Sequence, residues 1–163
     1  MKTLVIMRHA KAVSADGSGP DFDRVLNDRG KEDAAEMGKR LKAKKMQPDF
    51  VVCSAAKRTH KTAKLIAEQV GYATENISKE YELYEAGIAD VMQVLRQIDD
   101  QHKKVILVGH NPTVTGLVGF LSGTHIEGLP TSGQACISFP FQSWKQLTPQ
   151  SGNLEWVDSP KNA

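Results

Sequence analysis

The chain has 163 residues, which is enough for one domain with an ordinary core and too few for two. With 40% hydrophobic residues, 25% charged residues and a net charge of +2, it is typical of a soluble globular protein and gives no sign of nucleic-acid binding. No apolar stretch is long enough for a membrane span and the N-terminus carries no signal-peptide pattern, so we expect a cytoplasmic protein that does not bind membranes.

The first half of the chain alternates between strand and helix patterns. An apolar run at residues 3–7 predicts a buried strand, and a loop at residues 14–23 precedes a helix at residues 27–44. A second apolar run, at residues 50–53, predicts another strand. Ser54 then serves as a natural N-cap for a helix that ends near residue 70. The solvent-exposed face of this helix is expected to carry Lys57, Lys61, Lys64 and Glu68.

The second half continues the alternation. A short strand is predicted around Ile77, and an apolar run at residues 105–108 predicts another. After this run, Asn111 is expected to cap a helix in which Pro112 takes the first position. Between the two strands, apolar residues recur at helical spacing: Ile88, Val91, Met92, Leu95 and Ile98.

The C-terminal region follows a different pattern. Its apolar residues alternate along two segments separated by Ser151-Gly152-Asn153, which predicts a β-hairpin added to the sheet. We therefore expect one domain, residues 1–163, with a three-layer α/β/α sandwich, a mostly parallel central sheet and an antiparallel C-terminal hairpin. The alternating residues are Ala135, Ile137, Phe139, Phe141, Leu154 and Trp156.

Cationic and imidazole side chains follow three of the predicted strands. Arg8 and His9 follow the first strand, Arg58 lies in the first turn of the helix after the second, and His110 follows the strand at residues 105–108. Ligands of such sheets bind outside the carboxyl ends of the strands, so the fold should gather these residues in one site. Their charges favour an anionic ligand, above all a phosphoryl group.

These residue types suit phosphoryl transfer. A neutral imidazole is a competent phosphoryl acceptor, which makes His9 the candidate nucleophile if an acceptor holds its other ring nitrogen. Arg8 and Arg58 can each bind two phosphoryl oxygens through planar bidentate contacts. The free N–H groups of the helix start attract the same anion, and His110 could donate to a further oxygen.

Other kinds of site have little support in the sequence. There is no P-loop, dinucleotide-binding, nucleophile-elbow or His-Glu-x-x-His motif, so we expect neither a cofactor nor a metal ion. Cys53 and Cys136 lie in apolar runs and are expected to be buried free thiols. His60, His102 and His125 have no comparable context and are predicted to be ordinary surface histidines.

Four blocks of the sequence resemble those of the histidine phosphatase superfamily, the relatives of the phosphoglycerate mutases. They occur in the expected order between about residue 3 and residue 157, and the short length, with no inserted lid, is similar to the SixA-type phosphohistidine phosphatases. The resemblance implies that His9 is phosphorylated and that Arg8, Arg58 and His110 bind the phosphoryl group, with Ser54 and Asn111 beside the substrate. The blocks are Met7-Arg8-His9-Ala10, Leu26-Asn27-Asp28-Arg29-Gly30, Ser54 with Arg58 and Thr62-Ala63, and Gly109-His110-Asn111-Pro112.

Three further charged residues keep two interpretations each. Larger superfamily phosphatases carry an acid after the second helix. Glu85 is in register to be this general acid, and Glu82 is the weaker candidate. The alternative is that each is a surface carboxylate. An ester leaving group needs such an acid, whereas an imidazole departs more easily. Arg24 either reaches incoming substrate or is a solvated loop charge.

We therefore expect a metal-independent phosphatase, active as a monomer, that works through a phospho-His9 intermediate. The favoured substrate is protein phosphohistidine, because a short chain without a lid should leave the site open. Two alternatives remain: a phosphatase of small phosphate monoesters, in which Glu85 would be essential, and a phosphate-binding module without catalytic activity.

Overall fold

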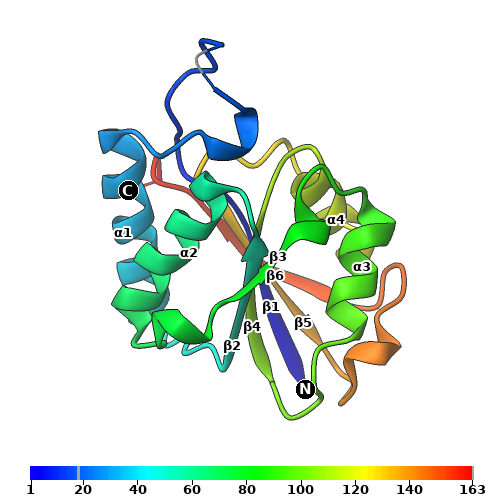
Figure 1. Cartoon of the computed structure of the whole chain (residues 1–163). Coiled ribbons are helices and arrows are strands. Elements are labelled where there is room, and N and C mark those ends of the chain that lie inside the picture. The colour runs from blue at the N-terminus through cyan, green and yellow to red at the C-terminus, as the bar shows by residue number, and fades with distance from the viewer. Residues whose placement is uncertain (18, 163) are drawn as a thin grey trace.

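A six-stranded sheet forms the centre of the molecule, with the strand order β3-β2-β4-β1-β5-β6 (Figure 1). The computed structural model describes residues 1–17 and 19–162; residue 18, in the predicted loop 14–23, and residue 163, at the end of the predicted domain, lie outside the described part. The strands are β1 (Lys2–Arg8), β2 (Phe50–Ser54), β3 (Ser78–Glu80), β4 (Lys104–Gly109), β5 (Gln134–Phe139) and β6 (Asn153–Asp158).

The sheet is mostly parallel, as predicted. Strands β1, β2, β3 and β4 are linked by parallel pairings, whereas β5 is antiparallel to both β1 and β6. The parallel strands are connected through helices, which such crossovers require. The last two strands form the antiparallel hairpin that the alternating apolar pattern indicated.

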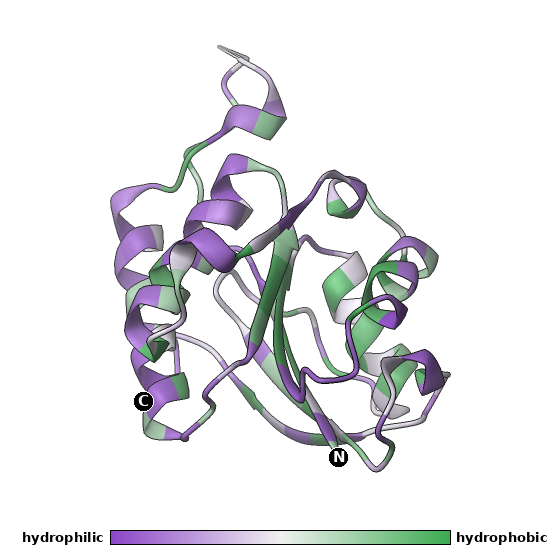
Figure 2. Cartoon of the chain, turned by 60° about the horizontal axis from the view of Figure 1, so that its bottom comes forward, coloured by the Kyte–Doolittle hydropathy of each residue, from purple (hydrophilic) through white to green (hydrophobic). Residues whose placement is uncertain are grey.

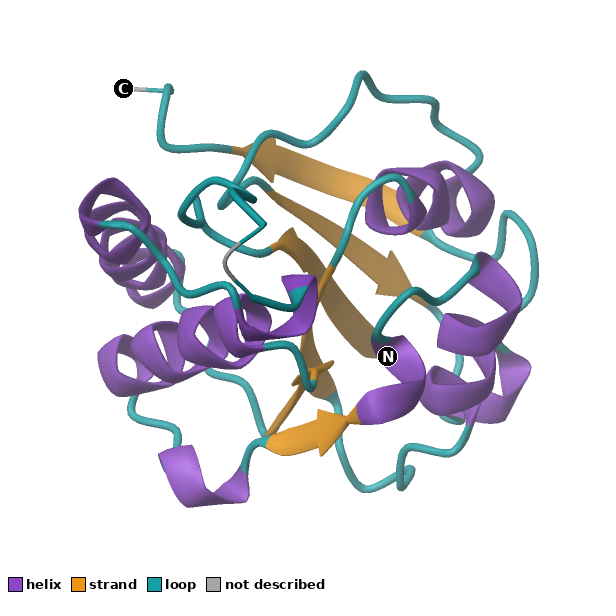
Figure 3. Cartoon of the chain, turned by 45° about the horizontal axis from the view of Figure 1, so that its top comes forward, coloured by secondary structure: helices purple, strands orange, loops and turns teal. Residues whose placement is uncertain are grey.

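Helices cover both faces of this sheet (Figures 1 and 3). On one face lie α1 (Asp28–Ala43) and α2 (Lys57–Val70), and on the other lie α3 (Ile88–Arg96) and α4 (Thr113–Ser122). The prediction of a three-layer α/β/α sandwich is thus confirmed. None of the described helices combines the length and the apolar composition needed to cross a bilayer.

The two faces of β1 contribute to two separate parts of the core. Leu4 and Ile6 pack in a cluster with Leu117 of α4, whereas Val5 and Met7 pack in a cluster with helix α1 on the opposite face. This division follows from the period of two along a strand. Each of these strand side chains is fully buried, which stabilises the fold by about 1.5–3 kcal/mol per side chain. In Figure 2 the central strands are accordingly mostly hydrophobic, and hydrophobic and hydrophilic residues alternate along the helices.

Helix α1 closely approaches its two neighbours through glycines. A Cβ at Gly30 would lie 2.1 Å from the carbonyl oxygen of Lys11, and a Cβ at Gly38 would lie 2.9 Å from the Cβ of Gln69 in α2. A larger residue at Gly30 would therefore push α1 away from the segment after β1, and one at Gly38 would push it away from α2. The close contact at Gly30 fixes the position of the segment that follows His9.

The register of the parallel strands brings the predicted site together. Arg8 at the end of β1 pairs with Gly109 at the end of β4, and the N–H of His9 donates to the carbonyl of Gly109 at 3.1 Å. Strand β2 lies on the other side of β4, with Cys53 opposite Val108. Residues that follow β1, β2 and β4 therefore emerge at the same edge of the sheet.

Two local predictions at helix starts need correction. Helix α2 begins at Lys57 with Ala56 as its N-cap, so the predicted N-cap role of Ser54 is wrong. Ser54 instead ends β2, because its pairing with Glu80 of β3 extends the strand by one residue. Helix α4 begins at Thr113 with Pro112 as its N-cap, one residue later than predicted.

Candidate active site

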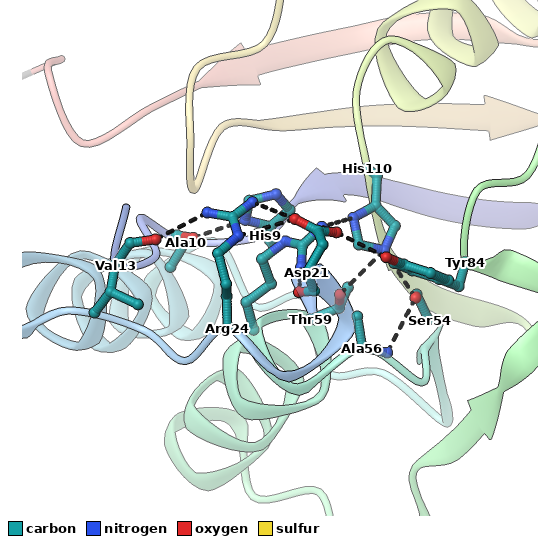
Figure 4. A network of polar contacts seen from close by, with 11 residues as sticks. His9, Ala10, Val13, Asp21, Arg24, Ser54, Ala56, Thr59, Tyr84 and His110 are labelled. Atoms are coloured by element: carbon teal, nitrogen blue, oxygen red, sulfur yellow. Dashed lines mark hydrogen bonds and ion pairs between the residues drawn. The ribbon is translucent and has the colours of Figure 1, made fainter. Parts of the chain in front are cut away.

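The imidazoles of His9 and His110 face each other at the carboxyl edge of the sheet. Their ring centroids lie 5.4 Å apart at an interplanar angle of 59°. His9 follows β1, His110 follows β4, and the buried Arg58 reaches them from the first turn of α2. Figure 4 shows both rings within one network of polar contacts.

His9 is held in a single tautomer. Its Nδ1 donates a hydrogen bond to the carbonyl oxygen of Ala10 at 2.7 Å, so Nε2 is left without a proton when the ring is neutral. Burial of the ring, to which the nearby arginines add, lowers the pKa of His9 to about 4. At neutral pH the ring therefore presents a free electron pair at Nε2. The acceptor that the sequence could not identify is the carbonyl of the next residue.

His110 is held by hydroxyl groups on one side and by a guanidinium on the other. Its Nε2 lies 2.8 Å from the Oγ of Ser54 and 3.3 Å from the Oγ1 of Thr59, and its Nδ1 lies 3.4 Å from an N–H of Arg58. Because the guanidinium can only donate, Nδ1 accepts and Nε2 carries the proton. Burial, with the charge of Arg58 next, lowers the pKa of His110 to about 3.

The two arginines each keep one buried N–H group free. Arg8 donates through Nη1 to the carbonyl of Leu129 at 3.2 Å, and burial lowers its pKa. Arg58 donates through Nη1 to the carbonyl of Asp21 at 2.8 Å. In both side chains Nε is buried and has no hydrogen-bond partner among the described residues. Unpaired buried donors are costly, so these two groups indicate a place for an acceptor such as a phosphoryl oxygen.

Sequence reasoning missed Asp21, which lies in the short 3-10 helix η1 (Asp21–Asp23). Its carboxylate contacts Arg58 at 3.0 Å and Arg24 at 2.8 Å and accepts a hydrogen bond from the hydroxyl of Tyr84 at 2.7 Å. The hydrogen bond from Tyr84, followed by that from Arg24, holds the pKa of Asp21 well below its usual range. An ionised carboxylate therefore occupies part of the guanidinium fork of Arg58. The spacing of three between Asp21 and Arg24 was the one signal available in the sequence.

Tyr84 was also missed. It follows the 3-10 helix η3 (Tyr81–Leu83), its ring meets His110 edge-on at a centroid distance of 5.6 Å, and it meets Phe22 of η1 at 5.0 Å. The hydrogen bond to Asp21 raises the pKa of Tyr84, so the phenol keeps its proton at neutral pH. Tyr84 thus links η1 to His110.

Sequence comparison agrees with this geometry. The profile of the histidine phosphatase superfamily (branch 1) matches residues 4–91, more than half of the chain. The chain belongs to the histidine phosphatase superfamily. Its family and its fold together support a phosphatase of the histidine phosphatase type.

Similar proteins extend over nearly the whole chain. An uncharacterized protein of Mycobacterium tuberculosis is 33% identical over 143 residues, which cover 80% of this chain and 85% of that protein. A solved structure from Nakamurella multipartitia, provisionally named phosphohistidine phosphatase SixA, has a TM-score of 0.83 at 27% identity and covers 98% of this chain and 96% of its own. The protein histidine phosphatase SixA complexed with tungstate has a TM-score of 0.84 at 23% identity, with 98% of both chains covered.

The remaining predicted site residues lie at different distances from the histidine pair. Ser54 contacts His110 directly, and Arg24 belongs to the network through Asp21, where it also donates to the carbonyl of Val13 at 2.9 Å. Arg24 is therefore not a free loop charge. Its positive charge is one of those that lower the pKa of both histidines.

Asn111 supports the site rather than lining it. Its Nδ2 donates to the carbonyl of Leu129 at 2.8 Å, the same carbonyl that accepts from Arg8, and its Oδ1 accepts from the hydroxyl of Thr115 at 2.7 Å. Both polar ends of the Asn111 side chain are thus used within the protein. The residue holds the loop that positions Arg8.

Neither acidic candidate belongs to the network. Glu85 is exposed, has a φ of 54°, and makes no hydrogen bond or ion pair within the described part of the chain. Glu82 is exposed and lines a separate groove with Glu80 and Asp90. Across residues 1–17 and 19–162, no group of three or more histidine, cysteine or acidic side chains is arranged to hold a metal ion.

Proposed function

We propose that this protein is a phosphohistidine phosphatase that works through a phospho-His9 intermediate. The observation that carries this proposal is the fixed tautomer of His9: Nδ1 is bound to the carbonyl of Ala10, and the lone pair of Nε2 is free at a pKa of about 4. The nucleophile thus needs no base to remove a proton before it attacks. The unpaired Nε–H groups of Arg8 and Arg58 supply donors for the phosphoryl oxygens.

The reaction has two displacements at phosphorus. In the first, Nε2 of His9 forms a bond to phosphorus while the bond to the leaving nitrogen breaks, and the electron pair departs with that nitrogen. In the second, water attacks the phospho-His9, inorganic phosphate is released, and the electron pair of the N–P bond returns to Nε2. Arg8 and Arg58 stabilise the charge on the phosphoryl oxygens in both steps, and His110 contributes once its Nε2–H turns from Ser54 to a phosphoryl oxygen. We propose that these groups make a metal ion unnecessary.

The protonation state of the nearest carboxyl group favours phosphohistidine over phosphate esters. An alkoxide leaving group must gain a proton, whereas an imidazole departs more easily. Asp21 lies in the network, but its pKa is held below its usual range, so it has no proton to give at neutral pH. Similar solved structures that carry the SixA name, as a phosphohistidine phosphatase or a protein histidine phosphatase, support the same substrate class.

A phosphomonoesterase on the same scaffold is the second candidate. The observation in its favour is that Glu85 directly follows Tyr84, whose ring contacts His110. In this role the segment after η3 would have to turn the Glu85 carboxylate toward the leaving oxygen. In that case the rate on esters would depend on Glu85, and the rate on phosphohistidine would not.

A substrate panel separates the two candidates. We expect the wild-type protein to hydrolyse a phosphohistidine peptide with a higher kcat/KM than aryl or sugar phosphates, and Glu85→Gln to leave the phosphohistidine rate within about twofold. Glu75→Gln, at another exposed carboxylate, is the matched control. A loss of about 100-fold on the preferred substrate in Glu85→Gln alone would favour the esterase. Tight phosphate binding without turnover of any substrate would favour a non-catalytic module.

A further inference from the structure

A groove of about 400 Å³ beside the site is lined by cationic side chains. It lies between the segment that enters α1 and the outer face of α2. We call it the basic groove. Its polar lining is Lys31, Lys57, His60, Lys61 and Lys64, and its apolar lining is Val25 and Leu26.

The cations of the basic groove are poorly neutralised. Lys57 pairs with Asp23 at a loose 3.7 Å, whereas Lys31, Lys61 and Lys64 form no ion pair within the part of the chain that the structure describes. No acidic residue lines the groove. The positive potential also affects its histidine: burial, with the charges of Lys79 and Lys64 next, lowers the pKa of His60.

The basic groove adjoins the active-site network through the chain itself. Lys57 immediately precedes Arg58, and Val25 immediately follows Arg24. Both arginines bind Asp21, so the groove begins where this network ends. Lys57, Lys61 and Lys64 occupy one face of α2 and extend over about 10 Å along the helix axis. An extended peptide covers that length with about three residues.

We infer, on the basis of the proposed function, that the basic groove binds an acidic segment of the protein that carries the phosphohistidine. Charge complementarity is the reason for choosing an acidic partner, and the exposed Val25, which follows Arg24 in the chain, offers an apolar contact. The segment would hold the substrate protein while its phosphohistidine enters between His9 and His110. Substrate choice would thus be divided between a phosphoryl site and a separate charged surface.

A second groove would repel the same segment. It has a volume of about 340 Å³, lies against α3 and β3, and carries Glu80, Glu82 and Asp90 with no cationic residue in its lining. The two grooves are therefore opposite in charge. Of these two grooves, the basic groove is the one that attracts an acidic segment.

Synthetic peptides test this inference. One peptide carries a single phosphohistidine flanked on both sides by glutamates, and the matched peptide has glutamine at the same positions. We expect the wild-type protein to hydrolyse the glutamate peptide with a kcat/KM about tenfold higher. This preference should shrink as salt is added, because screening shortens the reach of exposed charges to about 10 Å at 0.1 M.

Two charge-reversal variants locate the effect. In the double variant Lys61→Glu with Lys64→Glu, the preference for the glutamate peptide should vanish while kcat/KM on p-nitrophenyl phosphate stays unchanged. The control is Lys39→Glu with Lys42→Glu, which makes the same change of charge at exposed positions near the C-terminal end of α1. The control should keep the preference.

The inference is overturned if the wild-type protein does not prefer the glutamate peptide, or if both double variants reduce the preference equally. Failure of the proposed function gives a different result: the wild-type protein would hydrolyse p-nitrophenyl phosphate and neither peptide. In that case, fluorescence anisotropy of an unphosphorylated glutamate peptide tests binding to the basic groove independently of catalysis. Equal binding to the wild-type protein and to Lys61→Glu with Lys64→Glu would refute a role for the groove.

Discussion

Acidification is expected to destabilise the folded protein through the two site histidines. Burial lowers the pKa of His9 to about 4 and that of His110 to about 3, from an ordinary value of 6.5. In the unfolded chain both groups regain the ordinary value, so the unfolded chain takes up protons first as the pH falls. The free energy of unfolding should therefore be level above about pH 7 and decrease from about pH 6.5 towards pH 4.

The size of this effect follows from proton linkage. Between about pH 7 and pH 5, a histidine that titrates at about 6.5 only when unfolded contributes about 2 kcal/mol. Two such groups give about 4 kcal/mol, a large fraction of the 5–15 kcal/mol that is typical of a domain. Asp21 does not interfere, because its pKa lies below its usual range and it contributes only below about pH 4.

Urea unfolding at about pH 7 and pH 5 measures the decrease. Asparagine does not titrate, so His9→Asn and His110→Asn should each lose about half of the difference between the two pH values. His125→Asn, at an exposed histidine, is the control and should keep the full difference. The reasoning fails if the wild-type protein is equally stable at both pH values, or if the control variant changes the difference as much as the site variants do.

The remaining predictions concern the anion-binding groups. Arg58→Lys keeps the charge but loses the planar fork, so kcat/KM on p-nitrophenyl phosphate should fall by about 100-fold in a protein that stays folded; a loss below about threefold would argue against bidentate binding. Asp21→Asn removes the carboxylate that occupies the guanidinium of Arg58, so tungstate should inhibit about fivefold more tightly. Weaker inhibition in that variant would mean that Asp21 positions Arg58 rather than competing with the anion.

The fold was predictable because its signals are local. The central parallel strands β1, β2 and β4 contain apolar runs, and β6 has the alternation of a strand with one face buried more than the other. The position of Arg8, His9, Arg58 and His110 was predictable for a related reason. All four follow or border strand ends, and parallel pairing brings those ends to one edge.

Ser54 marks the limit of such local reasoning. Serine before a helical pattern is a favoured N-cap, but pairing with β3 keeps this residue in β2 and turns its hydroxyl toward His110. Serine does favour the N-cap position, but the pairing of Ser54 with β3 outweighed this preference. A strand boundary that depends on a neighbouring strand cannot be located from a short window of sequence.

Asp21 and Tyr84 could not be predicted as partners. They are 63 residues apart in the chain, and each lies in a short 3-10 helix or beside one, without hydrophobic periodicity. Their contact depends on how two loops meet above the sheet. The acceptor for Nδ1 of His9 could not be predicted for a different reason: it is a backbone carbonyl, and every residue has one.

The decisive measurement is the identification of the phosphorylated nitrogen. The protein should be mixed with a phosphohistidine peptide, quenched in alkaline denaturant to preserve N–P bonds, and studied by mass spectrometry and phosphorus NMR. Because Nδ1 of His9 is bound to the carbonyl of Ala10, phosphate should appear on Nε2 of His9 and be absent in His9→Ala. Phosphate on Nδ1, on His110 or on no residue during turnover would contradict the mechanism.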